Sequence, residues 1–473
     1  NNSISIDGPT SLSTSENQIA RFQAANWATL EVDGHDTDAV AAALTKAKTH
    51  DRPTLIACKT IIGYGAPTKA GTAATHGSPL GKDEVAGARQ KLGWAYEPFV
   101  VPDAIRAAWT KAGQRGGADF AAWTKRHDAH AQRAEHDRVV AGELPANFAS
   151  AVNELKTAIA AEAPKIATRQ SSQKVIEALV PIMPELIGGS ADLTGSNNTK
   201  AKNAAPIKAG QYGGSYIYYG IREHEMASAM NGLALHGGVI PFGGTFLVFT
   251  DYCRPAIRLS ALMHQRVIYV MTHDSIGLGE DGPTHQPVEH LAALRAIPNL
   301  LVFRPAETME TAECWALALA ARNRPSILAL TRQALPHLRA DAAVANHCAR
   351  GGYVIRPAKN ARKATLIASG SEVSIAVEAR EALEAQGIGA AVVSLPCWEL
   401  FDEQPESYRR EVLGDGLRVG IEAAGGFGWE RYLGTDGVFI GMKGFGASAP
   451  APELYKHFGI TAGAIVDTVK AKL

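Results

Sequence analysis

Strand and helix patterns alternate strictly along residues 148–346, and this alternation constrains the fold of the chain more than any other feature. The predicted strands are 186–189, 216–218, 267–272, 300–303 and 326–331. The predicted helices are 150–162, 172–183, 224–236, 251–264, 286–295 and 307–321. Such alternation implies right-handed crossovers and a mostly parallel sheet. We therefore expect functional residues on loops beyond the carboxyl ends of these strands.

A second α/β block precedes this one and covers residues 1–147. Its predicted strands are Thr29–Val32 and Thr54–Lys59, on either side of a predicted helix at Asp38–Lys48. The alanine- and charge-rich stretch 118–142 is typical of a surface helix. The apolar strand residues are those of a parallel sheet that is buried on both faces.

A third α/β block covers residues 347–473. A helix is predicted at Ser371–Gln386, with Ser371 as its N-cap. The predicted strands are Thr365–Ala368, Ala391–Leu395, Arg418–Glu422 and Val438–Gly441. The fold class is therefore α/β in three blocks, in keeping with a chain of 473 residues.

Composition excludes several classes of protein. The 47 Lys and Arg residues balance the 47 Asp and Glu residues, so no basic surface for nucleic acid is expected. No apolar run approaches the ~20 residues of a membrane span. The five cysteines form no C-x-x-C pair, which argues against a disulfide framework or a zinc site and favours a reducing cytoplasm.

The densest cluster of chemically active residues is the loop Thr272–Pro287, directly after a predicted buried strand. Two histidines, three acids and three glycines lie within it. A solvated loop is the alternative, but this density at the end of a strand favours a ligand site. The candidates there are His273, Asp281 and His285.

Glu223 lies where a predicted strand leads into a helix with an apolar face. A carboxylate in that place can be buried with a raised pKa and a proton to share. It can equally be an acid that the helix dipole favours at its N-terminus. Residue pattern alone does not separate these two readings.

An aromatic residue recurs every third position at Phe246, Phe249 and Tyr252, so the three share one face if this segment is helical. Such a stripe is more often part of a core than of a cofactor site. The neighbouring Gly243-Gly244 permits close approach of the backbone, which weakens the core reading.

Four single residues on predicted loops or helix ends complete the candidates from the residue pattern: His76, Arg169, Ser196 and Arg332. Arginines at the ends of helices and strands suit phosphate, which they bind with two parallel hydrogen bonds. Taken singly, each is more often a partner in a surface salt bridge.

Several motifs, in order along the chain, give it a close resemblance to the transketolases. They are Asn2–Gly8, Lys69–Thr72 with His76-Gly77, Gly188–Leu193, His273–Pro287 and Thr331–Gln333. They fall in all three blocks. Residues 1–473 resemble the C-terminal two-thirds or more of such an enzyme.

The resemblance implies a three-domain thiamine diphosphate enzyme, with mostly parallel sheets and helices on both faces. The domains would be the C-terminal part of the diphosphate-binding domain with a connector (1–147), the pyrimidine-binding domain (148–346) and the transketolase C-terminal domain (347–473). Such enzymes move a two-carbon ketol unit from a ketose phosphate such as xylulose 5-phosphate to an aldose phosphate such as ribose 5-phosphate, in the pentose phosphate pathway. The resemblance also implies a divalent metal, Mg²⁺ or Ca²⁺, and a cytoplasmic homodimer with active sites at the subunit interface.

The resemblance also assigns roles to residues. Those implied to be catalytic are Glu223, His76 and His285. Those implied to bind the cofactor are Glu223, Phe246, Phe249, Tyr252, Asp192 and His76. Those implied to bind substrate are His76, Arg169, Ser196, His273, Asp281, His285 and Arg332. The implied metal ligands are the side chain of Asn2 and the backbone carbonyl of Ile4.

The chain departs from the family pattern at its start, because no Gly-Asp-Gly precedes Asn2. The Gly414–Gly416 copy cannot serve, since no asparagine follows Asn360. We therefore expect the N-terminal segment of the diphosphate-binding domain to be absent, and the chain without it to bind thiamine diphosphate weakly and to lack ketol transfer.

Two alternative functions stay open at this point. A dihydroxyacetone synthase would use the same residues with formaldehyde as the acceptor. A catalytically silent transketolase-like partner would keep the fold alone, although the presence of Glu223, His76, His285 and both arginines argues against it.

Overall fold

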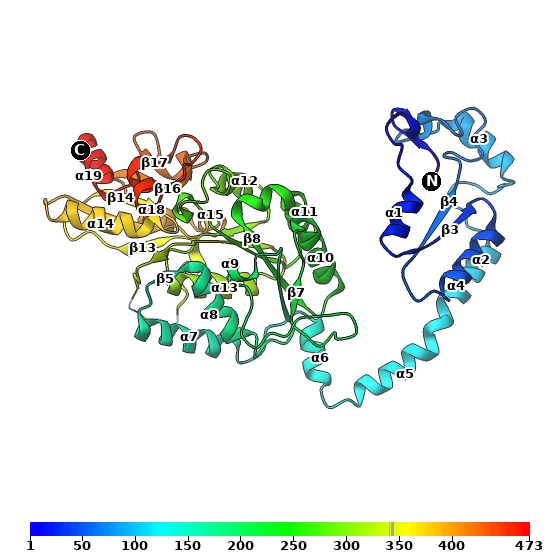
Figure 1. Ribbon diagram of the computed structural model, residues 1–473, viewed down its shortest axis with the longest axis horizontal. Coiled ribbons are helices and arrows are strands. Elements are labelled where there is room, and N and C mark those ends of the chain that lie inside the picture. The colour runs from blue at the N-terminus through cyan, green and yellow to red at the C-terminus, as the bar shows by residue number, and fades with distance from the viewer. Residues whose placement is uncertain (340, 342–344) are drawn as a thin grey trace. The chain divides into compact units, whose positions relative to one another are not determined.

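A computed structural model describes residues 1–339, 341 and 345–473, and its backbone divides into two compact units. Unit 1 is Asn1–His127 and unit 2 is Asp128–Leu473 (Figure 1).

Unit 1 is built on a parallel pair of strands, β3 (Ala28–Asp33) and β4 (Thr54–Lys59). The crossover between them is α2 (Thr37–Ala47), whose N-cap Asp36 accepts hydrogen bonds from two backbone amides of the first turn. The predicted strands and helix of this block are thus confirmed. The remaining elements are β1 (Ile4–Ser5), β2 (Gly8–Pro9), η1 (Thr10–Leu12), α1 (Gln18–Ala24), η2 (Ala73–Thr75), α3 (Lys82–Lys91), α4 (Asp103–Gly113), η3 (Gln114–Gly116) and α5 (Gly117–Asp128).

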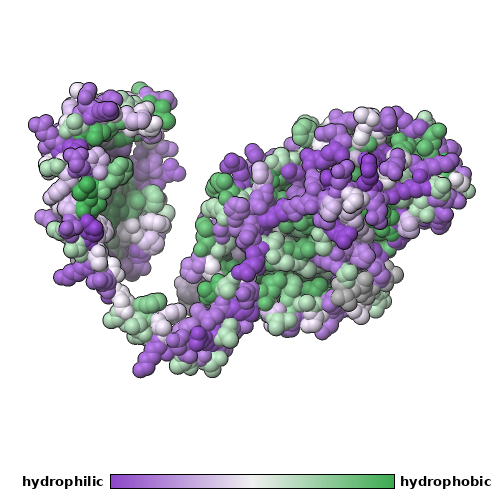
Figure 2. Space-filling view, turned by 180° about the vertical axis from the view of Figure 1, so that it is seen from behind, coloured by the Kyte–Doolittle hydropathy of each residue, from purple (hydrophilic) through white to green (hydrophobic). Residues whose placement is uncertain are grey.

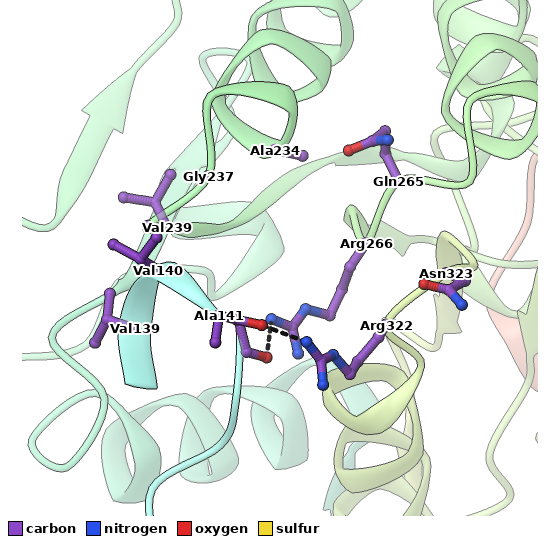
Figure 3. A pocket seen from close by; sticks show the side chains of 12 residues that line it. Val139, Val140, Ala141, Ala234, Gly237, Val239, Gln265, Arg266, Arg322 and Asn323 are labelled. Atoms are coloured by element: carbon purple, nitrogen blue, oxygen red, sulfur yellow. Dashed lines mark hydrogen bonds between the residues drawn. The ribbon is translucent and has the colours of Figure 1, made fainter. Parts of the chain in front are cut away.

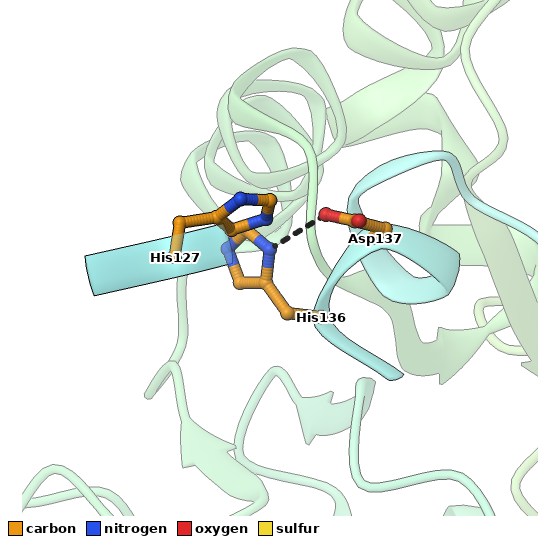
Figure 4. A group of neighbouring side chains, drawn as sticks. All are labelled: His127, His136 and Asp137. Carbon is orange, nitrogen blue, oxygen red and sulfur yellow. Dashed lines mark hydrogen bonds and ion pairs between the residues drawn. The ribbon is translucent and has the colours of Figure 1, made fainter. Parts of the chain in front are cut away.

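The prediction of one surface helix over 118–142 is wrong, because α5 ends at Asp128 and α6 (Arg133–Val140) begins after a gap. In that gap the His130 ring accepts a hydrogen bond from the Gln132 backbone amide at 3.1 Å. A side chain that takes a backbone amide competes with the helical hydrogen bond. Later along α6, His136 Nδ1 lies 3.3 Å from Asp137 Oδ1 (Figure 4).

Two arginines, Arg266 and Arg322, bind backbone carbonyls of the chain just beyond α6. Arg266 Nη2 donates to the Gly142 carbonyl at 2.8 Å, and Arg322 donates to the Ala141 carbonyl (Figure 3). The two guanidinium groups line a pocket of about 190 Å³. Burial, and then the charge of Arg322, lowers the pKa of Arg266 to about 10. Cations at the carbonyl end of a helix complement its dipole, so the pair secures the connector into the next domain.

The centre of unit 2 is a six-stranded sheet of order β10-β11-β9-β8-β6-β7, and all its pairs are parallel. Its strands are β6 (Leu186–Ser190), β7 (Tyr216–Tyr218), β8 (Ile240–Phe246), β9 (Ile268–Thr272), β10 (Leu301–Phe303) and β11 (Ser326–Leu330). The parallel sheet is confirmed, and five of its strands lie where they were predicted. The sixth, β8, was missed.

Helices cover both faces of this sheet, as expected. Ile268 and Val270 of β9 pack into one apolar core, whereas Tyr269 and Met271 pack into another on the opposite face. The helices and short 3₁₀ turns of this part are α7 (Phe148–Glu162), α8 (Thr168–Leu179), α9 (Thr194–Asn197), α10 (Glu223–His236), η4 (Leu247–Phe249), α11 (Thr250–Leu262), η5 (Ile276–Leu278), α12 (His290–Arg295) and α13 (Thr308–Ala320). A small antiparallel pair joins β5 (Ile166–Ala167) to β12 (Ala334–Leu335).

The last third of the chain forms a five-stranded sheet of order β13-β15-β14-β16-β17. Its strands are β13 (Tyr353–Arg356), β14 (Arg362–Ala368), β15 (Gly389–Ser394), β16 (Leu417–Gly425) and β17 (Val438–Met442). Only the edge strand β13, which was not predicted, runs antiparallel to its neighbour. The other elements are η6 (His347–Arg350), α14 (Glu372–Glu384), α15 (Trp398–Asp402), α16 (Glu406–Leu413), α17 (Glu430–Leu433), α18 (Ala451–His457) and α19 (Ala462–Lys472).

Ser371 is the N-cap residue of α14, as predicted, but its hydroxyl does not cap the helix. It donates to Glu372 Oε1 at 2.7 Å and lies 3.1 Å from the Tyr455 hydroxyl.

No helix in the described part of the chain has the length and apolar character needed to cross a membrane.

Candidate active site

The site residues predicted in unit 2 follow the carboxyl ends of neighbouring parallel strands. His273 comes directly after β9, and Arg332 lies two residues beyond β11. Phe249 lies in the 3₁₀ turn after β8, and Asp192 lies two residues beyond β6. These four strands are adjacent in the order β11-β9-β8-β6, so the loops meet at one edge of the sheet.

The aromatic rings of Phe246, Phe249 and Tyr252 lie together at this edge of the sheet, and we call them the aromatic floor. Phe246 and Phe249 are stacked with centroids 5.6 Å apart, and Tyr252 is tilted against Phe249 at 5.8 Å. Phe246 also stacks on His273 at 3.7 Å, and Phe249 meets His285 edge-on at 5.5 Å. The stripe is therefore continuous with the polar loop and is not part of a closed core.

His273 is held neutral in this environment. Its pKa falls to about 3, first through burial and then through the charges of Arg169, Arg332 and His285. The Thr272 hydroxyl lies 2.8 Å from its Nδ1. An uncharged imidazole with one nitrogen fixed in this way can exchange a hydrogen bond with a ligand hydroxyl through the other.

Two arginines close together lack an acidic partner. Burial, followed by the charge of Arg332, lowers the pKa of Arg169. Arg169 donates to the Ser196 carbonyl, and Arg332 Nη1 donates to the Leu278 carbonyl at 3.0 Å. Among the residues described, no ion pair is recorded for either guanidinium. Two cations that repel each other in this way are ready to bind an anion.

Glu223 opens α10 in its first turn and is half-buried. Its charge adds to the effect of burial in raising the pKa of Cys253 to about 12, which places the carboxylate near the start of α11. Within the described ranges, no hydrogen bond to the Glu223 side chain is recorded. The carboxylate is therefore free to meet a ligand next to the aromatic floor.

The remaining predicted residues of unit 2 are more exposed. Asp281 and Asp192 are exposed, and Ser196 on α9 is half-buried. Asp192 has a φ of 59°, a left-handed conformation that aspartate tolerates better than most residues.

Three predicted residues lie in unit 1. Asn2 Oδ1 accepts a hydrogen bond from the Ile4 amide at 3.0 Å, which leaves that oxygen one further lone pair and the Ile4 carbonyl outside the contact. Both are oxygen donors of the kind that Mg²⁺ and Ca²⁺ prefer. His76 is exposed at the end of η2.

Sequence reasoning missed the side chains that support His273. Asn197 Oδ1 accepts a hydrogen bond from the Thr272 hydroxyl at 2.8 Å, across 75 residues of chain. Asn197 Nδ2 donates to the Ser190 hydroxyl at 3.3 Å. Local patterns do not reveal such contacts, because they depend on which strands are neighbours in the sheet.

The residues fit a cofactor with a planar ring and an anionic tail. Stacked phenylalanines suit the faces of an aromatic ring, and a free carboxylate beside them suits a basic ring nitrogen. The fit rests on two observations: among the described residues the Glu223 side chain has no hydrogen-bond partner, and its charge acts on Cys253 of α11, the helix that follows Phe249.

Three family models match the chain. They are "Transketolase, thiamine diphosphate binding domain" at residues 1–145, "Transketolase, pyrimidine binding domain" at 164–337 and "Transketolase-like TK C-terminal domain" at 351–461. A transketolase from Sinorhizobium medicae (strain WSM419) is 56% identical over 466 residues, covering 98% of this chain and 67% of the relative.

Solved structures agree with these matches. A transketolase from Leishmania mexicana matches with a TM-score of 0.91 and 41% identity, over 99% of this chain and 70% of that one. A transketolase from Pichia stipitis in complex with sedoheptulose 7-phosphate matches with a TM-score of 0.92 and 40% identity, over 100% of this chain and 71% of that one.

The first family match corrects one expectation. We expected the N-terminal segment of the diphosphate-binding domain to be absent, but the model of that domain matches residues 1–145. The expectation rested on missing short motifs, whereas the match extends over residues 1–145. The prediction of weak cofactor binding and of no ketol transfer depended on that absence. It is therefore withdrawn together with the expectation of an absent segment.

Proposed function

This chain belongs to the transketolase family, and we propose that the residues at the carboxyl edge of its six-stranded sheet bind the sugar phosphates and the cofactor ring. The chain is a transferase of the transketolase type, which uses thiamine diphosphate with a divalent metal. Neither a formaldehyde-specific synthase nor a silent partner is needed to account for it.

The observation that carries the site assignment is the meeting of three kinds of group at one edge: the aromatic rings, the Glu223 carboxylate, and two arginines without an ion pair among the described residues. When bound, thiamine diphosphate supplies the nucleophilic carbon for the two-carbon unit. Phe246, Phe249 and Tyr252 would hold its ring by stacking, and Glu223 would hold a proton against a ring nitrogen. Asp192 and His76 are further cofactor contacts in this proposal.

The sugar is held by hydrogen bonds in the loop after β9. His273 and His285 border the aromatic floor, and Asp281 lies in the same loop. Neutral imidazole can accept from one sugar hydroxyl while it donates to another group. We assign His285 and His76 to proton transfer at the sugar hydroxyls.

The far phosphate of the sugar is bound by Arg169 and Arg332, with Ser196 beside them. The support is that both guanidiniums lie near His273 and repel each other, so an anion between them lowers the electrostatic energy. Asn2 and the Ile4 carbonyl are the proposed ligands of Mg²⁺ or Ca²⁺.

We propose a homodimer with its sites at the subunit interface, in a cytoplasmic setting and in the pentose phosphate pathway. Apolar side chains on and near α10 and α11 are exposed, and they include Ile221 at 80% and Leu262 at 61% exposure. Figure 2 shows hydrophobic areas among hydrophilic ones on the face of unit 2 turned to the viewer. Domain boundaries at 147/148 and 346/347 remain part of the proposal.

The test of the proposed site is Glu223→Gln, which keeps size and removes charge. We expect at least a ~100-fold loss in the rate of ketol transfer, because a general acid–base group contributes this much. Glu225→Gln is the matched control, since Glu225 is exposed one residue beyond His224 on the same helix. A Glu223→Gln protein within threefold of the unaltered rate contradicts the assignment.

A further inference from the structure

The loop Thr272–Pro287 is tied to the last third of the chain by hydrogen bonds that its sugar-binding role does not require. The Ser448 hydroxyl donates to the Glu280 carbonyl at 2.6 Å. Gln286 Nε2 donates to the Ala447 carbonyl at 2.9 Å, and it also donates within the loop to the Gly279 carbonyl. The second half of the loop is thus bonded at Glu280 and Gln286 to residues of the last third of the chain.

Tyr455 on α18 makes a third connection to the loop. Its hydroxyl lies 3.5 Å from the Ser275 hydroxyl and donates to Glu372 Oε1 at 2.7 Å. Glu372 begins α14 and has no exposed side-chain surface. The loop is therefore linked through Tyr455 to a carboxylate in the interior of the last third.

Arg304 comes directly after β10 of the six-stranded sheet and reaches this interior. Its Nε donates to Asp274 Oδ2 at 2.9 Å, and Asp274 is the residue directly after His273. Its Nη1 donates to the Ser369 carbonyl at 2.9 Å and pairs with Glu372. All four side chains are fully buried, so one guanidinium joins the site loop to β14 and α14.

A second ion pair completes the network. Both oxygens of Glu422 accept hydrogen bonds from Arg295 at 2.8 Å, and Trp429 Nε1 donates to the same carboxylate at 3.0 Å. Arg304 Nη1 lies 3.8 Å from Glu422. Removing one member of such a network leaves a buried charge without compensation, so its geometry is strongly enforced.

We infer that the last third of the chain acts as a brace for the site loop. Ser448 and Tyr455 from that third, with Arg304 from the end of β10, are the positioning residues that set His273 and its neighbours for the sugar. The inference rests on the proposed function for the sugar-binding role of the loop. None of the three side chains is assigned to touch substrate or cofactor. The simpler alternative is that these bonds add stability without setting the loop.

The gentlest test removes single hydroxyl groups, in Ser448→Ala and Tyr455→Phe. Hydrogen exchange in the full chain should quicken in residues 274–286 and stay unchanged in α10. The KM for the ketose phosphate should rise about threefold to tenfold for each variant. Ser448→Ala loses the hydrogen bond to the Glu280 carbonyl, and Tyr455→Phe loses the donation to Glu372 and the contact with Ser275. The thiamine diphosphate concentration for half-activity should change less than twofold. Tyr408→Phe is the matched control, since its hydroxyl donates to the Gly352 carbonyl at 2.9 Å.

A stronger perturbation is Arg304→Lys, which keeps the charge but cannot reach Asp274, Ser369 and Glu372 together. Arg339→Lys is its control, because Arg339 is also buried and pairs with Glu313 at 2.8 Å. We expect Arg304→Lys to quicken exchange in the loop and to raise the KM at least tenfold at equal residual stability. Arg339→Lys should lower stability alone.

Unchanged loop exchange in Ser448→Ala and Tyr455→Phe overturns the inference, as does a rise in KM that Tyr408→Phe shares. Failure of the proposed function looks different. In that case His285→Ala and Asp281→Ala leave the KM for sugar unchanged, while the brace variants still quicken exchange in the loop.

Discussion

At the scale of single residues, the site depends on charges held out of water. His273 is kept neutral by burial and by two arginines, and those arginines have a cation as neighbour instead of an acid. Each of these arrangements costs free energy as long as no ligand is bound. An anionic ligand offsets the repulsion between the arginines, which is why the arrangement favours sugar phosphates.

The buried state of His273 predicts a pH dependence of stability. Its pKa is about 3 in the folded chain against 6.5 for the free group, so the unfolded chain binds more protons between these values. Stability should therefore fall as the pH drops from about 6.5 towards about 3. His273→Asn removes the titrating group and suits the left-handed φ of 60° at this position.

Urea unfolding at pH 7 and pH 5 measures this effect. The unaltered chain should lose more stability between the two pH values than His273→Asn does. An equal loss in both proteins shows that His273 does not titrate differently on unfolding.

Sequence reasoning at this scale identified residues that stand in local motifs, such as Glu223, His273 and Arg332. It missed Asn197 and Arg304, whose partners are far along the chain. Thr272 is 75 residues from Asn197, and Glu372 is 68 residues from Arg304. The order of strands in the six-stranded sheet brings the first pair together, whereas the second pair joins that sheet to the last third of the chain.

At the scale of elements, β8 shows that a regular spacing of aromatic residues can suggest the wrong secondary structure. The spacing of Phe246, Phe249 and Tyr252 suggested a single helical face, but the three come from the end of a strand, a 3₁₀ turn and a helix. The strand itself was hidden by Gly243-Gly244, since glycine weakens strand patterns. These glycines are required because the sheet packs closely against α9 and α10.

Gly244→Ala tests this close packing. An added Cβ would lie 2.7 Å from Thr199 Cγ2 and 2.9 Å from Asn197 Nδ2, so the group that supports Thr272 must shift. We expect a loss of about 1–3 kcal/mol in the free energy of unfolding, as for other overpacked cores.

Gly232→Ala is the matched control, because nothing lies within 4 Å of its added Cβ on α10. It should stabilise the chain by up to about 1 kcal/mol through helix propensity. Denaturant unfolding of both variants measures the difference, and equal effects of the two substitutions would falsify the packing argument.

At the scale of the whole molecule, strand–helix alternation correctly predicted the α/β architecture, because βαβ crossovers leave few alternatives. The family models match in the predicted order along the chain. The expected absence of the N-terminal segment of the diphosphate-binding domain was wrong, since the model of that domain matches residues 1–145.

The exposed apolar side chains near α10 and α11 predict self-association. We expect analytical ultracentrifugation to give the mass of two chains. Leu262→Glu should shift the distribution towards one chain, because it places a charge in the apolar surface. Lys200→Glu, a charge change away from these helices, is the control. A single-chain mass for the unaltered protein contradicts the proposed dimer.

The central claim is that the edge of the six-stranded sheet binds sugar phosphates for ketol transfer, and Arg332→Ala tests it most directly. The measurement is the ratio of kcat/KM for xylulose 5-phosphate to that for xylulose, with ribose 5-phosphate as the acceptor. Loss of a charge-assisted bond to phosphate should lower this ratio by about 1.5–3 kcal/mol, or roughly tenfold to 150-fold. An equal loss for both donors would show that Arg332 has a structural role, and it would contradict the account.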